Sequence, residues 1–78
     1  MPTILRINGF SFYFFASDRY EPPHVHVSRG EGRAKFWLLG IELSKTSGFR
    51  RHELRLIEKI IRKNRDELLE GWNAYFGD

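Results

Sequence analysis

The fold is decided by residues 24–38, which have the sequence HVHVSRGEGRAKFWL. Apolar and polar side chains alternate through residues 24–28 and again through 33–38, and a glycine-containing turn at 29–32 separates the two runs. A period of two predicts two antiparallel strands joined as a hairpin. Counting outward from Ser28 and Arg33, which flank the turn, His26 faces Lys35 and His24 faces Trp37.

This register gives the two sides of the hairpin different chemistry. The apolar side collects Val25, Val27, Ala34 and Phe36. The polar side collects His24, His26, Ser28, Arg33, Lys35 and Trp37. Because a slip of one residue would exchange the two sides, burial of the apolar side specifies this pairing strongly.

The remaining strands follow from turn chemistry. Residues 3–7 are rich in β-branched side chains, and Asn8-Gly9 is the preferred two-residue hairpin turn, so 10–16 is predicted to return as the second strand. Residues 18–23 are predicted to be a loop, because Pro22-Pro23 favours extended backbone and removes two amide donors. Residues 41–43 are predicted to add a short fifth strand, with a linker at 46–48.

From residue 50 to 76 the hydrophobic period changes to 3.6, which predicts an amphipathic helix. Its apolar stripe consists of Leu54, Ile57, Ile61, Leu68, Trp72, Tyr75 and Phe76. The stripe keeps its phase throughout, which favours one continuous helix. Two signals favour a kink or break near Asn64. Residues 64–67 resemble a capping box, and a single helix would place its basic half at the N-terminus, against the helix dipole.

These elements predict the α+β class: an antiparallel sheet of four or five strands in residues 1–44, packed against helical residues 50–76, as one domain over 1–78. A continuous helix over residues 54–76 would be about 33 Å long, whereas a seven-residue strand spans about 23 Å. Trp72, Tyr75 and Phe76 would then overhang the sheet. They are the predicted interface of a homodimer or a complex with another protein.

Composition bounds the compartment and the partners. The net charge is +3 and there are no cysteines, which excludes disulfides and thiolate metal sites. The first residues lack the pattern of a secretory signal, and no apolar stretch approaches the ~20 residues of a membrane span, so we expect a cytoplasmic protein without membrane contact. Residues 50–65 are densely basic. Arg51, Arg55 and Arg62 are therefore predicted RNA contacts, with a solvated helical face as the alternative.

The polar side of the hairpin has side chains suited to phosphodiester chemistry. His24 and His26 are the candidate acid and base, Arg33 and Lys35 the candidate phosphate-binding residues, and Trp37 a surface on which an unpaired base could stack. The alternative is an ordinary solvent-facing sheet surface. Two histidines alone do not hold a metal, and nothing in the sequence places a further ligand such as Glu21 or His52 beside them. We therefore expect no metal and no cofactor, with a metal-dependent hydrolase as the third hypothesis after the two functions given below.

Several stretches together resemble the bacterial domain-of-unknown-function family numbered 4160. They are residues 1–6 (MPTILR), 21–27 (EPPHVHV) and 34–38 (AKFWL), with Gly48-Phe49, Glu53-Leu54, Asn64, Leu68, Trp72 and 75–77 (YFG). The resemblance covers nearly the whole chain. Relatives often have Ser after the Gly-Phe pair, where this sequence has Arg50, which weakens the expected helix cap.

The resemblance implies a setting rather than an activity. Genes of this family commonly lie beside those of a second small family, numbered 2442, and the pair resembles a toxin–antitoxin module. The expected function is therefore a toxin-like component that acts on or binds RNA, with a metal-independent ribonuclease as its possible enzymatic form. The alternative is a non-catalytic module that binds RNA or a protein partner, such as the antitoxin-like companion.

Overall fold

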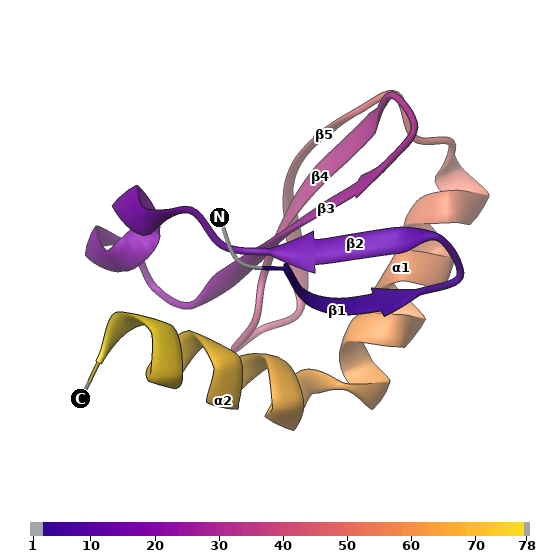
Figure 1. Ribbon diagram of the computed structural model, residues 1–78. Helices are drawn as coiled ribbons and strands as arrows, with labels where there is room; N and C mark the ends of the chain where they lie inside the picture. Colours follow the sequence, from indigo (N-terminus) through magenta and orange to yellow (C-terminus); the bar gives the residue numbers. More distant parts are fainter. Residues whose placement is uncertain (1–2, 78) are drawn as a thin grey trace.

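The computed structural model describes residues 3–77 as an antiparallel sheet followed by two helices (Figure 1). The α+β class is confirmed. The elements are β1 (Thr3–Ile7), β2 (Phe10–Tyr13), the 3₁₀ helix η1 (Ala16–Tyr20), β3 (His24–Arg29), β4 (Gly32–Trp37), β5 (Glu42–Ser47), α1 (Arg51–Lys63) and α2 (Arg65–Phe76). The five strands lie in sequence order, and each pairs with the next.

The hairpin turns lie where the sequence predicts them. Asn8 and Gly9 both have positive φ, 54° and 81°, as a type I′ turn requires. The predicted pairing of β3 with β4 is confirmed: His24 lies opposite Trp37, and His26 lies opposite Lys35. The turn between them is tighter than the predicted four residues, because the strands extend to Arg29 and Gly32.

The outer part of the sheet differs from the prediction. The predicted fifth strand is present, but β5 covers 42–47, so its predicted bounds of 41–43 and the linker at 46–48 are wrong. All six residues of β5 are exposed, so this edge strand carries no apolar alternation that would identify it. β5 is followed by Gly48, whose φ of +78° favours glycine and whose added Cβ would lie 2.6 Å from the Glu31 carbonyl oxygen. β2 ends at Tyr13 rather than at 16, and η1 follows.

The helical half is divided at Asn64, so the continuous helix favoured by the apolar phase is wrong. Asn64 has φ −114° and ψ 19°, and α2 leaves it in a new direction (Figure 1). The Asn64 side chain donates to the Ile60 carbonyl over 2.8 Å, and Arg65 donates to the Leu38 and Leu39 carbonyls over 2.9 and 3.1 Å. The Asn64 bond closes the end of α1, and the two Arg65 bonds join the start of α2 to the loop after β4.

The start of α1 is stabilised from inside the helix. Arg50 has no side-chain acceptor for the first amides, as the sequence indicated. Glu53 accepts instead, from the Arg50 backbone N–H at 2.8 Å and from the Arg29 guanidinium at 2.9 Å. The ion pair between Arg29 and Glu53 joins β3 to the first turn of α1.

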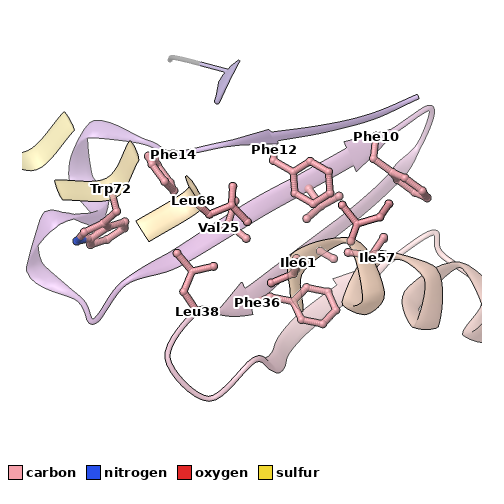
Figure 2. Close-up of a cluster of buried hydrophobic side chains, with 13 residues drawn as sticks. Phe10, Phe12, Phe14, Val25, Phe36, Leu38, Ile57, Ile61, Leu68 and Trp72 are labelled. Carbon is pink, nitrogen blue, oxygen red and sulfur yellow. The ribbon is translucent and has the colours of Figure 1, made fainter. Parts of the chain in front are cut away.

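Both helices pack on the apolar face of the sheet (Figure 2). Ile57 and Ile61 of α1 and Leu68 and Trp72 of α2 meet the side chains of the central strands. Trp72 is only 7% exposed and its ring lies 5.3 Å from that of Phe14, because the break turns α2 back along the sheet. The predicted overhang is therefore wrong for Trp72. What remains at the surface there is Tyr75, 40% exposed, and part of Phe76.

Candidate functional site

The face of the sheet away from the helices contains an open groove of about 430 Å³. β2, β3, β4 and β5 all contribute to it, because their polar positions alternate with those that enter the core. The groove is lined by Tyr13, Phe15, His26, Arg33, Ala34, Lys35, Lys45, Thr46 and Ser47.

Three cations line one side of the groove: Arg33, Lys35 and Lys45. Lys35 and Lys45 lie opposite each other on β4 and β5, a like-charge pairing that is unfavourable without an anion nearby. Glu21 neutralises Lys35 in part across 2.6 Å, and the hydrogen bond from Lys35 lowers the pKa of Glu21. Within residues 3–77 Lys45 makes no ion pair. The groove therefore keeps a net positive charge.

The other side of the groove is aromatic. Tyr13 lies beside His26 in the β2–β3 register, and their rings stack at 5.6 Å between centroids. Phe15, 40% exposed, meets the His26 ring edge-on at 4.6 Å. The flat faces of these rings therefore line the same groove as the three cations.

Beneath the aromatic side, one carboxylate meets two imidazoles. Asp18 Oδ2 accepts a hydrogen bond from His26 Nε2 over 2.9 Å, and Asp18 Oδ1 lies 3.2 Å from His24 Nε2. The Asp18 side chain is only 8% exposed and that of His24 is fully buried. His26, with 15% of its side chain exposed, is the member of this cluster that reaches the groove.

Local structure explains how a loop residue reaches β3. Within η1 the Asp18 carboxylate accepts the Phe15 backbone N–H over 2.8 Å, which fixes its direction. Pro22-Pro23 then leads the chain back into β3, where His24 Nδ1 donates to the Pro22 carbonyl over 2.9 Å. Burial raises the pKa of Asp18, but the Phe15 hydrogen bond and the charges of His24 and His26 outweigh it and leave that pKa below its ordinary value.

The histidines differ in what they can do. Burial lowers the pKa of His26, and the Asp18 carboxylate opposes that shift only in part, so His26 is a neutral imidazole near pH 7. His24 is enclosed between the Trp37 and Trp72 rings, at 5.5 and 5.2 Å, and exposes nothing. A ligand in the groove can therefore contact His26 but not His24.

The other predicted site residues fall into two groups. Arg33 and Lys35 line the groove with His26, whereas Trp37 does not: Lys35 Nζ covers its ring at 4.6 Å. The second group, Arg51, Arg55 and Arg62, lies exposed on α1, across the core from the groove, and Arg62 pairs with Glu58 at 2.9 Å. The structure therefore separates the basic helix from the polar strand face.

Sequence reasoning missed several residues of the site, among them Tyr13, Phe15, Lys45 and Asp18. Tyr13 and Phe15 were identifiable in part, since they alternate with the core positions Phe12 and Phe14. Lys45 was not, because β5 was predicted too short. Asp18 follows no periodicity, since a residue in a 3₁₀ turn has no fixed spacing to a strand.

The family described as Domain of unknown function (DUF4160) matches residues 9–73. The chain belongs to this family, as the resemblance indicated. Neither a search of curated proteins nor a search of solved structures found a match. In the part of the chain that the structure describes, no helix combines the length and apolar character needed to cross a membrane.

Proposed function

We propose that this protein binds single-stranded RNA in the groove on its open sheet face. The observation that supports this most is the meeting of three cations with the Tyr13, Phe15 and His26 rings in one open groove. Its volume of about 430 Å³ lies within the ~300–1,000 Å³ usual for ligand sites.

Each half of the groove suits a different part of a nucleotide chain. Lysine and arginine attract phosphates without regard to sequence, and the opposed Lys35–Lys45 pair is relieved when an anion lies between them. Exposed aromatic rings stack on unpaired bases, whereas bases within a duplex are covered by their neighbours. The combination favours single strands over duplexes.

Binding, rather than cleavage by paired histidines, is the activity that this geometry favours. Metal-free phosphodiester cleavage needs an acid and a base that both reach the substrate. His26 lies at the groove, but His24 is fully buried. The toxin-like role and the antitoxin-like companion belong to the same proposal and rest on the family resemblance.

The test compares two exposed cations on different surfaces. Fluorescence anisotropy of a labelled oligoribonucleotide would be measured for wild type, Lys45→Glu in the groove and the matched variant Arg55→Glu on α1. We expect Lys45→Glu to weaken binding and to reduce the salt dependence by about 0.7 in log–log slope for each phosphate that the variant no longer binds. Arg55→Glu should change both little. Equal effects of the two variants, or no salt-dependent binding by wild type, would refute RNA binding in the groove.

The biological role has a separate test. Induced expression of the wild type should slow growth, co-expression of the neighbouring companion should restore it, and Lys45→Glu should be less toxic at equal protein level. Toxicity that Lys45→Glu leaves intact would disconnect growth inhibition from the groove.

A further inference from the structure

We propose that Asp18, His24 and His26 form a binding site for one divalent transition-metal ion, of which Zn²⁺ is the model. The inference concerns the cluster beneath the groove and does not depend on RNA binding. It differs from the sequence-based expectation of a metal-free site, because Asp18 supplies the third ligand that the sequence could not place.

The three side chains are spaced as ligands of one ion. Zinc ligands about 2.0–2.1 Å from a tetrahedral ion lie about 3.3 Å from one another. Asp18 Oδ1 lies 3.2 Å from His24 Nε2, and Asp18 Oδ2 lies 2.9 Å from His26 Nε2. All three ligand atoms lie within 4.8 Å of one another. Small side-chain rotations would therefore complete the geometry.

The strongest observation is that His24 Nε2 is buried without a hydrogen-bond partner among the described residues. His24 Nδ1 donates to the Pro22 carbonyl, so the proton of a neutral His24 is on that nitrogen. Nε2 then presents its lone pair, fully buried, and among the described residues it has no hydrogen-bond partner. It faces Asp18 Oδ1 at 3.2 Å, outside hydrogen-bond geometry. Two electron-rich atoms held this close are stabilised by a cation between them, either a proton shared as an ion pair or a metal ion.

The outer contacts are those that orient metal ligands. A metal-bound histidine usually donates its other N–H to a carbonyl or a carboxylate, as His24 does to Pro22. A ligating carboxylate is commonly held by a further hydrogen bond, and here Phe15 N–H holds Asp18. Both bonds are independent of the contacts between the ligands. They leave Nε2 and the carboxylate directed at one point.

The ligand set indicates which ions fit. Two imidazoles and one carboxylate suit zinc and its first-row neighbours, whereas Mg²⁺ and Ca²⁺ prefer oxygen alone. Three protein ligands leave a tetrahedral ion one open position. Because His26 borders the groove, this position is reachable from there by water or by an oxygen of a bound ligand.

The test uses the untagged full chain, whose lack of cysteine removes thiolate binding. Zn²⁺ and Co²⁺ would be titrated by calorimetry, with Mg²⁺ as the oxygen-preferring comparison, and unfolding temperature would be followed in parallel. We expect one equivalent of Zn²⁺ to bind and to raise the unfolding temperature, and Mg²⁺ to do neither. Asp18→Asn and His26→Gln should each weaken Zn²⁺ binding by about 100-fold or more, beyond the 10–100-fold typical for losing an outer contact.

The third histidine of the chain provides the matched control. His52 is exposed on α1, so His52→Gln should bind Zn²⁺ as wild type does. Circular dichroism would verify that each variant folds, and because His26 is partly exposed its replacement should be tolerated better than that of His24. The proposal is overturned if folded wild type binds no Zn²⁺ at a tenfold excess, or if His52→Gln loses binding as the cluster variants do.

Discussion

Asp18 Oδ2 lies 2.9 Å from Nε2 of His26, although Asp18 belongs to a 3₁₀ turn and His26 to the middle of a strand. The other oxygen of the same carboxylate lies 3.2 Å from His24. One side chain thus joins the loop between β2 and β3 to two alternate positions of β3. This contact positions Phe15 at the groove, since the Phe15 backbone N–H donates to the same carboxylate.

Replacement of Trp72 tests the position of α2. Trp72→Ala should destabilise the monomer by roughly 3–5 kcal/mol, because it leaves a cavity against Phe14. Tyr75→Ala, at a side chain that is 40% exposed, should cost about 1 kcal/mol. Urea unfolding and equilibrium sedimentation would measure both. If Trp72→Ala keeps its stability but loses self-association, the result would support the predicted interface at Trp72 instead.

Two glycines with positive φ separate backbone strain from close contact. Gly30→Ala should cost about 1–2 kcal/mol through φ alone, since nothing lies within 4 Å of its added Cβ. At Gly48 the Cβ would also meet the Glu31 carbonyl oxygen at 2.6 Å. Gly48→Ala should therefore cost at least about 1 kcal/mol more than Gly30→Ala. Equal unfolding free energies for the two variants would argue against this approach of β5 to the turn.

A pair of tyrosines tests the aromatic side of the groove. If a base stacks on Tyr13, Tyr13→Ala should weaken RNA binding by about 5- to 150-fold, the equivalent of ~1–3 kcal/mol. Tyr20, 87% exposed on η1 and outside the groove, is the matched control. Anisotropy titrations at one salt concentration would compare them. A loss of the same size in Tyr20→Ala would point to a different surface.

Glu53 should make stability depend on pH. The hydrogen bond from the Arg50 backbone N–H, together with that from Arg29, lowers the pKa of Glu53 in the folded state. Its contribution is therefore complete above the ordinary value of about 4.3 and is lost as the pH falls through the lower folded-state value. Glu53→Gln should be less stable than wild type at pH 7, and the difference should shrink as the pH falls below the ordinary pKa of a glutamate. A difference that persists in acid would indicate that packing, rather than charge, had been removed.

Alternation in the sequence was sufficient for the centre of the sheet but not for its edge. The β3–β4 register was predictable because a slip would bury His26 and expose Val25. The extent of β5 was not predictable, because its backbone pairs with β4 while all of its side chains are exposed. In the helical half the apolar phase survives a change of direction at Asn64. Only the capping pattern and the charge order indicated the break.

The candidate site divides in the same way. His26, Arg33 and Lys35 share a face by strand periodicity, so the sequence places them together. The burial of His24 depends on Trp72, which arrives from α2 only because the helix breaks. The approach of Asp18 depends on a 3₁₀ turn and two prolines. Neither contact follows from a repeat, and these two contacts convert a polar strand face into a cluster of three ligands.

The enclosure of His24 between Trp37 and Trp72 has an optical consequence. These are the only two tryptophans in the sequence, and both rings contact this one imidazole. A paramagnetic ion bound to an imidazole quenches the emission of an adjacent indole. The protein's ultraviolet fluorescence should therefore report whether a paramagnetic ion such as Co²⁺ is bound at His24, with no label attached. The two tryptophans, one from β4 and one from α2, thus lie on either side of the same candidate ligand in β3.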